Sequence, residues 1–177
     1  MQNVRIRHTA ELDDAALAAV RALCDKAFEG DFSDADWEHA LGGMHALAYE
    51  DGVLVGHASL ILRRLLHGGR ALRTGYVEAV AVRASRQRNG HGGAMMAALE
   101  RLIRGGYDLG ALGATDDGAA FYRARGWRAW EGPTSALTLD GIRRTAAEDG
   151  GIFVFEAAAA LDPTGELTCD WRDGDLW

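Results

Sequence analysis

Cysteine, lysine and long apolar runs are scarce in this chain, and each scarcity excludes a class of protein. The two cysteines among 177 residues, Cys24 and Cys169, are far apart and form no Cys-x-x-Cys motif. We therefore expect buried thiols rather than a disulfide or a metal site. No stretch approaches the ~20 apolar residues that span a bilayer, and the start of the chain lacks a signal-peptide pattern. A cytoplasmic protein without a membrane partner is the expectation.

The charge balance argues against nucleic acid as a partner. The chain carries 19 basic and 26 acidic residues, a net charge of -7, whereas phosphate binding requires a basic surface. A cationic substrate suits an acidic protein better. His39 and His45 lack the spacing of metal ligands, so we interpret them as structural histidines with hydrogen-bonding partners and expect no metal.

Length and periodicity predict one α/β domain spanning residues 1–177. The apolar patterns and turn signals favour strands at 4–8, 45–50, 53–62, 72–82, 109–112, 135–139 and 152–155, and helices at 13–28, 34–40, from 90 onward and at 117–125. Residues 143–151 are expected to form a charged loop, and Trp127 and Trp130 to cover the core. This order of elements predicts a mixed layer structure.

The stretch from Gly75 to Glu100 contains the most informative pattern. Tyr76–Val82 is apolar and β-branched, Arg83–Asn89 is mostly cationic, and apolar residues then recur at helical spacing. The helix start is rich in glycine, at positions 90, 92 and 93. Unpaired N–H groups of a first helical turn attract anions, and glycine lets an anion approach the backbone without meeting a Cβ. An anion site is predicted, with a merely flexible connection as the alternative.

Two common anion motifs do not match this stretch. The Rossmann fingerprint would need glycine where Met95 stands, and a Walker loop needs a lysine, whereas the only lysine is Lys26. The pattern Gln87-x-x-Gly90-x-Gly92 instead resembles the acyl-CoA signature of the GCN5-related N-acetyltransferases. The order of elements also matches that fold, a mixed, mostly antiparallel central sheet flanked by helices.

The resemblance implies acetyl-CoA as co-substrate. In that fold the pantetheine arm pairs with the strand before the loop, and the pyrophosphate meets N–H groups of the loop and helix start. The cofactor-binding residues implied here are Val80, Ala81, Val82, Arg83, Gln87, Arg88, Asn89, Gly90, His91, Gly92 and Gly93.

Two residues are candidates for catalysis. Glu78 stands inside an apolar strand, where a lone carboxylate needs a partner or a function, and burial would raise its pKa towards that of a working base. It would act directly or through water; pairing with an arginine is the structural alternative. Tyr122 lies in a segment that resembles the tyrosine-bearing helix of the family, where the hydroxyl is proposed as general acid. Simple packing is the alternative for Tyr122.

Longer stretches extend the resemblance to one branch of the family over nearly the whole chain. They include Leu41-Gly42-Gly43-Met44-His45 and Cys169-Asp170-Trp171-Arg172, which resemble the aminoglycoside 2′-N-acetyltransferases of mycobacteria and relatives. This resemblance implies acetylation of the 2′-amino group of aminoglycosides, antibiotic resistance and a homodimer. The substrate-binding residues that it implies are Asp31, Asp36, Glu78, Glu148, Asp149 and, through the C-terminal carboxylate, Trp177.

Clusters of acids at 29–38 and 170–175 agree with a polycationic sugar, although such clusters are often only solvated surface. Two other functions stay open at this point. One is acetylation of another cationic metabolite or of a cell-wall amino sugar. The other is a non-catalytic module that binds acyl-CoA.

Overall fold

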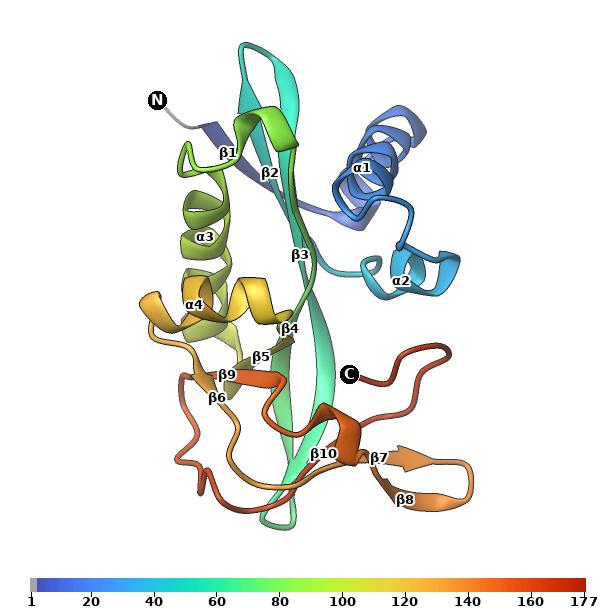
Figure 1. Ribbon diagram of the computed structural model, residues 1–177, viewed down its shortest axis with the longest axis vertical. Coiled ribbons are helices and arrows are strands. Elements are labelled where there is room, and N and C mark those ends of the chain that lie inside the picture. Colours follow the sequence, from blue (N-terminus) through green and yellow to red (C-terminus); the bar gives the residue numbers. More distant parts are fainter. Residues whose placement is uncertain (1–2) are drawn as a thin grey trace. The chain divides into compact units, whose positions relative to one another are not determined.

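The computed structural model describes residues 3–177, which divide into two compact units (Figure 1). The first unit contains the chain up to Ile61 together with Val77–Leu102, and the second contains Leu62–Tyr76 and Ile103–Trp177. Strands β3 (Val53–His67) and β4 (Arg70–Val82) therefore each contribute residues to both units. Within residues 3–177, no helix combines the length and the apolar character needed to cross a membrane.

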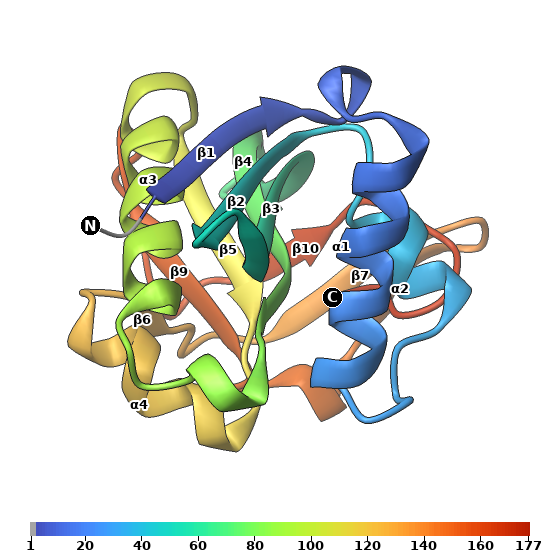
Figure 2. The same cartoon turned by 90° about the horizontal axis from the view of Figure 1, so that it is seen from above.

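The first unit is a sheet covered by helices on both faces. Its elements are β1 (Asn3–His8), η1 (Thr9–Glu11), α1 (Asp14–Ala27), α2 (Asp34–His39), β2 (Met44–Glu50), the first part of β3, the last part of β4, η2 (Ala84–Arg86) and most of α3 (His91–Gly106). β1 pairs antiparallel with β2, and β2 antiparallel with β3. Figure 2 shows α1 and α2 on one side of these strands and α3 on the other.

Successive residues of β3 point to the two helical layers. A Cβ on Gly56 would lie 2.9 Å from the Cε of Met95 in α3, whereas His57 approaches Cys24 of α1, with 3.9 Å between Nδ1 and Sγ. This alternation is the two-residue period of a strand. The turn that joins β2 to β3 has positive φ at both central residues, Asp51 (49°) and Gly52 (80°), so it is the type I′ hairpin that Asp-Gly predicts.

The second unit is a mixed sheet with one short helix. Its further elements are β5 (Leu109–Gly113), α4 (Asp116–Ala124), β6 (Arg128–Ala129), β7 (Thr134–Thr138), β8 (Gly141–Arg144), η3 (Ala146–Glu148), β9 (Ile152–Glu156) and β10 (Leu167–Cys169). The strands are ordered β6-β9-β5-β4-β3-β10-β7-β8. β4 and β5 are parallel, as are β10 and β7, while β5–β9 and β7–β8 are antiparallel.

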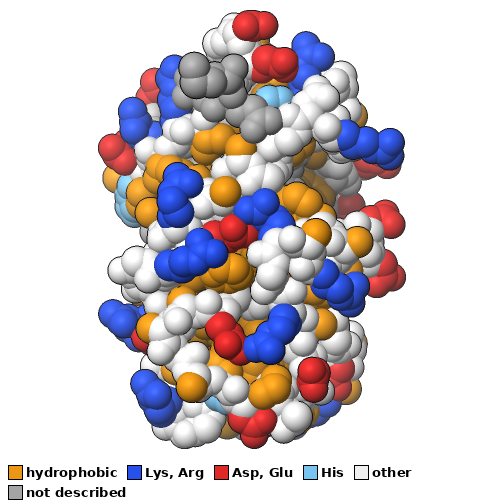
Figure 3. All heavy atoms as spheres, turned by 90° about the vertical axis from the view of Figure 1, so that its left-hand side faces the viewer, with side chains coloured by type: hydrophobic (Ala, Val, Ile, Leu, Met, Phe, Trp, Pro, Cys, Tyr) orange, Lys and Arg blue, Asp and Glu red, His pale blue; other side chains and the backbone are white. Residues whose placement is uncertain are grey.

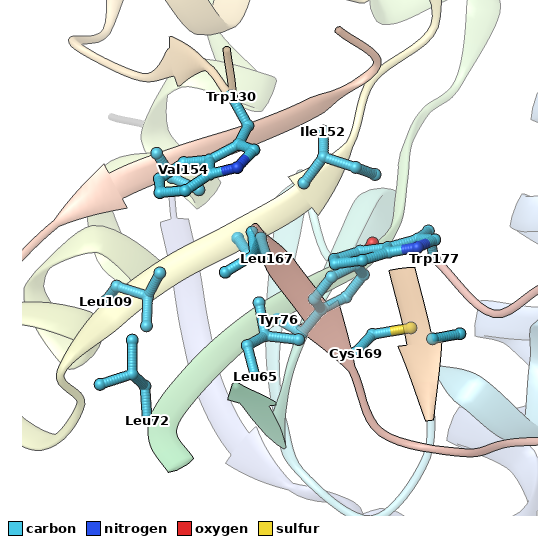
Figure 4. Close-up of a cluster of buried hydrophobic side chains, with 12 residues drawn as sticks. Leu65, Leu72, Tyr76, Leu109, Trp130, Ile152, Val154, Leu167, Cys169 and Trp177 are labelled. Carbon is cyan, nitrogen blue, oxygen red and sulfur yellow. The ribbon is translucent and has the colours of Figure 1, made fainter. Parts of the chain in front are cut away.

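Aromatic side chains from distant parts of the sequence fill the core of the second unit (Figure 4). The ring of Trp177 lies beside Tyr76 and Cys169, and Trp130 lies near Val154. Trp130 is 2% exposed and Trp177 is 9% exposed, so the final tryptophan is a core residue. Trp127 and Trp130, which were expected to cover the core, are themselves buried in it, and both cysteines are free and buried, as expected.

Three strands were not predicted. The expected loop at 143–151 begins inside β8 and continues through η3, because β8 has no apolar alternation and joins the sheet only by backbone pairing with β7. β6 has two residues and β10 has three, which is too short for a period to show in the sequence. The other boundaries differ from the expected ones by a few residues.

Candidate active site

The strand that precedes the cationic loop is distorted in its middle. Ala79 of β4 has φ 49°, a left-handed conformation that costs free energy for any residue with a side chain. Two side chains of β3 donate hydrogen bonds to the carbonyls at this point. The Nδ1 of His57 donates to the carbonyl of Ala79 (2.9 Å) and the Oγ of Ser59 to that of Glu78 (3.3 Å). A left-handed residue within a strand is typical of a β-bulge, which interrupts the regular ladder and leaves backbone groups for a ligand, and we refer to this position at Ala79 as the β4 bulge.

The predicted cofactor residues Val80 and Val82 follow the bulge and are half-buried. Backbone amides beside a bulge are suited to bind an amide-containing arm such as pantetheine, which has donors and acceptors in alternation. The pairing of this strand with a pantetheine arm, which the acyl-CoA signature implies, stays a prediction.

The loop after β4 leads into a helix start built for an anion. Arg88 (φ 61°) and Gly90 (φ 83°) both have left-handed backbones, and Ala94 N donates to Gly90 O (3.0 Å), which closes the first turn of α3. The N–H groups of Gly92 and Gly93 precede this first intrahelical donor, so they have no carbonyl within the helix to bind. Partial positive charge is therefore available where phosphate groups would lie.

Some predicted cofactor residues also hold the loop itself. The side-chain amide of Gln87 donates to Val82 O (3.4 Å), and Arg83 donates from its backbone to Val55 O (2.8 Å) and from its guanidinium to Leu54 O (3.1 Å). Arg83 is exposed, so its remaining donors can still meet an anion. A cavity of about 570 Å³ lies beside this arginine and includes Lys26 of α1, which sequence reasoning did not connect with the loop.

His91, at the start of α3, is 5% exposed, and neither of its ring nitrogens has a hydrogen-bonding partner among the described residues. Its Nε2 lies 3.9 Å from the carboxylate of Glu50, which also pairs with Arg86. Sequence reasoning missed Glu50 and Arg86, because nothing in their spacing links them to the loop.

The predicted acids of the first unit differ in their surroundings. Glu78 is half-buried rather than enclosed, and Asp31 is exposed in the connection between α1 and α2. Asp36 accepts from the backbone N–H and the hydroxyl of Ser33, at 2.7 Å each, so it closes the capping box of α2. Asp36 therefore has a structural role at the start of this helix.

In the second unit, a pocket of about 540 Å³ brings together Asp116, Glu148 and Asp149. Asp149 accepts from the backbone and hydroxyl of Thr134 and pairs with Arg144. The Arg144 guanidinium, aided by Thr134, holds the pKa of the Asp149 carboxyl well below its usual range. Asp149 is therefore an ionised carboxylate that holds Thr134 and Arg144, whereas Glu148 beside it is exposed as well and has no such role in the pocket.

Tyr122 is 8% exposed within α4. Its ring packs against Trp127 and Phe153, with centroids 6.2 and 6.3 Å apart, and Gly118 makes room for it, because a Cβ there would lie 3.2 Å from the ring. Burial raises the pKa of Tyr122 to about 12, so the phenol keeps its proton at neutral pH. Such a group can donate a hydrogen bond or a proton but cannot act as a base.

The Cys-Asp-Trp-Arg stretch holds the final residues in place. Cys169 Sγ donates to Leu176 O (3.3 Å), and Arg172 donates to Trp177 O (2.9 Å). Asp170 accepts from Arg63 (2.8 Å), a 4%-exposed guanidinium that also donates to Leu176 O (2.7 Å). Trp177 itself donates from Nε1 to a threonine hydroxyl.

The described residues contain no cluster of three or more metal-ligating side chains. On the face that Figure 3 shows, acidic and basic side chains are interspersed, and no extended basic patch is present. The first unit thus offers a glycine-rich helix start after an interrupted strand, and each unit has exposed carboxylates.

Comparison with known proteins identifies the family. The model of the acetyltransferase (GNAT) domain matches residues 8–130. An aminoglycoside 2′-N-acetyltransferase of Mycolicibacterium fortuitum is 50% identical over 181 aligned residues, covering 100% of this chain and 93% of that protein.

Solved structures show the same fold at low sequence identity. The GNAT family N-acetyltransferase YhbS from Escherichia coli, in complex with CoA, has a TM-score of 0.65 at 15% identity, covering 95% of this chain and 89% of its own. A GNAT family acetyltransferase from Brucella melitensis, in complex with acetyl-CoA, has a TM-score of 0.60 at 21% identity, covering 94% and 96%. The predicted fold class is confirmed, and the chain belongs to the GCN5-related N-acetyltransferases, enzymes that use acetyl-CoA.

Proposed function

We propose that this enzyme transfers the acetyl group of acetyl-CoA to the 2′-amino group of aminoglycoside antibiotics and so gives resistance. The observation that carries the proposal is the 50% identity, over the full chain, to a protein named aminoglycoside 2′-N-acetyltransferase. A polycationic sugar requires negative charge, and each unit has exposed acidic side chains, among them Asp31 in the first and Glu148 in the second.

In the proposed reaction the lone pair of a neutral amine attacks the thioester carbonyl carbon. The new C–N bond forms, the C–S bond breaks, the sulfur leaves as a thiolate, and one proton passes from the nitrogen and one to the sulfur. We assign the first proton to Glu78, acting directly or through water. Tyr122, which carries its proton at neutral pH, is assigned to the departing sulfur.

The cofactor is assigned to the bulged end of β4 and to the loop that follows. Val80, Ala81 and Val82 are proposed to pair with the pantetheine arm, and the N–H groups from Arg88 to Gly93 to hold the pyrophosphate. Support comes from the left-handed Ala79 and Gly90, which expose backbone at these two places.

The acceptor is assigned to the carboxylates that the resemblance implies. Asp31 and Glu148 are exposed and available to a cationic ligand, while Asp36 and Asp149 already hold protein groups and would present only their remaining lone pairs. Trp177, through its C-terminal carboxylate, is also assigned to binding the aminoglycoside. We expect Asp31 and Glu148 to contribute more affinity than the two bracing acids.

A cytoplasmic homodimer, with each chain forming one acetyltransferase domain over residues 1–177, completes the proposal. Support for a dimer comes from β8, an edge strand whose residues are all exposed, and from the apolar side chains around it. An unpaired strand edge with apolar neighbours is a ready site for a second copy.

The test measures thiol release from acetyl-CoA with two closely related drugs. Tobramycin has a 2′-amine and kanamycin A a 2′-hydroxyl. Turnover with tobramycin alone is expected and would establish both the reaction and the position acetylated. Equal turnover with kanamycin A would reject the 2′ assignment, and no turnover with either, while acetyl-CoA still binds, would direct the search to other amines.

A further inference from the structure

Two buried histidines of the first unit form a chain of hydrogen bonds that ends at the β4 bulge. The Oγ1 of Thr9 lies 2.8 Å from His45 Nε2, His45 Nδ1 lies 2.9 Å from His57 Nε2, and His57 Nδ1 lies 2.9 Å from the carbonyl oxygen of Ala79. Both imidazoles are 0% exposed. The proposed chemistry uses neither of them.

The chemistry of the last acceptor determines the direction of every bond in this chain. A carbonyl oxygen can only accept, so His57 Nδ1 carries a hydrogen and donates it to Ala79. In a neutral imidazole the other nitrogen then accepts, so His57 Nε2 accepts from His45 Nδ1. His45 Nε2 must in turn accept from the hydroxyl of Thr9.

Burial keeps both imidazoles in the neutral state. Desolvation by burial, aided by the charge of His8, lowers the pKa of His45 to about 4. Desolvation, aided by His45, lowers the pKa of His57 to about 3. Both rings are thus neutral at physiological pH, and the tautomer of each is set by its neighbours.

At the end away from Ala79, the series of hydrogen bonds continues from Thr9 to the backbone of Gly42 and Gly43. Gly42 N donates to Thr9 Oγ1 (2.8 Å), and Thr9 N donates to Gly43 O (2.9 Å). The hydroxyl of Thr9 accepts from Gly42 N, and of the two acceptors within reach of its hydrogen, His45 Nε2 (2.8 Å) and Gly43 O (3.2 Å), the imidazole nitrogen is the nearer. The whole series is satisfied from the 42–43 backbone to Ala79, which makes it rigid.

We propose that His57 is a positioning residue for acetyl-CoA, holding Ala79 in its left-handed conformation so that the backbone of Val80 is oriented to receive the cofactor. The proposal rests on the proposed function only in assigning β4 as the cofactor strand. A left-handed alanine persists only where its surroundings over-determine it, and the bond from His57 is the contact that does so at its carbonyl. The hydrogen bond that His45 Nδ1 donates to its Nε2 keeps His57 in the tautomer that can donate to Ala79.

A matched pair of amide variants separates positioning from general support of the fold. The amide nitrogen of asparagine can occupy the place of Nδ1, whereas a glutamine amide reaches the place of Nε2. His57→Asn therefore keeps a donor for Ala79 and loses His45, while His57→Gln keeps a group beside His45 and loses the donor. Each variant removes one imidazole and inserts one amide.

The readout is the dissociation constant for acetyl-CoA by titration calorimetry, with thermal unfolding as the check of folding. We expect His57→Asn to bind within about threefold of the unaltered protein and His57→Gln to bind ~10- to 100-fold more weakly, the loss associated with an unsatisfied buried carbonyl. Thr9→Val, which removes a bond at the far end and leaves the Ala79 contact, is expected to lower the melting temperature with little change in affinity. Equal affinities for the two amide variants would overturn the proposal.

A measurement on the unaltered protein tests the proposal even where the variants do not fold. Nitrogen-15 NMR of the imidazoles should show His45 and His57 both protonated at Nδ1 and not at Nε2, with the His57 signals shifting when acetyl-CoA is added. An Nε2–H tautomer at His57, or signals unmoved by a saturating cofactor, would reject the assignment. No acceptor is present in these experiments, so inactivity towards aminoglycosides would leave the test intact.

Discussion

His57 Nδ1 lies 2.9 Å from the carbonyl oxygen of Ala79, and this contact joins a fully buried histidine to a left-handed residue inside strand β4. The bond requires a hydrogen on Nδ1, and in the neutral imidazole this is the tautomer that accepts at Nε2. Protonation of His57 would place the new hydrogen on its Nε2 against the hydrogen that His45 Nδ1 donates. The stability of the first unit is thereby coupled to pH.

We expect the free energy of unfolding to decrease as the pH falls from about 6.5 to about 4.5. In the unfolded chain, histidine titrates near pH 6.5, whereas the folded pKa values are lowered to about 4 for His45 and about 3 for His57. Below pH 6.5 the unfolded state thus binds more protons, and each histidine can contribute up to about 1.4 kcal/mol of lost stability per pH unit. Urea unfolding across this range measures the slope. His57→Asn should reduce the slope by about half, and an unchanged slope would contradict the prediction.

Removal of the Tyr122 hydroxyl should slow catalysis without weakening cofactor binding. Tyr122→Phe keeps the ring that packs on Trp127 and removes the proton proposed for the leaving thiolate, so we expect kcat to fall ~100-fold, a loss typical of a general acid. Tyr107→Phe, at a half-buried tyrosine after α3, is the matched control and should keep full activity. Steady-state kinetics decide; an unchanged kcat for Tyr122→Phe would remove its catalytic role.

The glycine pair before β2 should tolerate no side chain at its second member. A Cβ on Gly43 would lie 2.2 Å from the carbonyl oxygen of Leu60, so Gly43→Ala must displace backbone, and we expect a loss of about 2 kcal/mol or more. The control is Gly105→Ala, since its Cβ would meet open space in α3 and alanine favours the helix by up to about 1 kcal/mol. Chemical denaturation should therefore move the two variants in opposite directions.

A charge on the β7–β8 hairpin should separate the proposed dimer. Leu139 and Ile142 are 86% and 56% exposed, which is unusual for large apolar side chains on a protein that remains monomeric. Leu139→Glu with Ile142→Glu should give a monomer in size-exclusion chromatography with light scattering. Val53→Glu, at an exposed apolar residue outside this hairpin (51%), should leave the mass unchanged. A dimer that survives the double substitution would exclude this hairpin as the interface.

Much of the fold was predictable because the signals lie within single elements. The Asp51-Gly52 hairpin, the caps formed by Ser33 and the helix that begins after Gly90 all depend on residues a few positions apart. Strand β8 was missed because an exposed edge strand has no buried face, and only a buried face imposes a period on the sequence.

The candidate site was predictable to the same extent. The glycine-rich loop follows from local backbone chemistry, and a polar residue in an apolar strand marked Glu78. His57 is likewise a polar residue within an apolar strand, but no role was predicted for it. The partners of Asp149 and His91 could not be inferred, because Thr134, Arg144 and Glu50 reach them only in the folded chain.

The sequence by itself determined the family, the glycine-rich loop and the order of most helices and strands, because these depend on short-range backbone preferences and on motifs of contiguous residues. Only the tertiary structure decided which carboxylates bind other protein groups and how Cys169 and Arg172 hold the final residues. It also decided that Thr9, His45 and His57 form a series of hydrogen bonds that ends at the carbonyl of Ala79. The physical reason is that a buried polar group requires a hydrogen-bonding partner. The sequence shows which residues require one, but only the folded structure shows which distant residue is the partner.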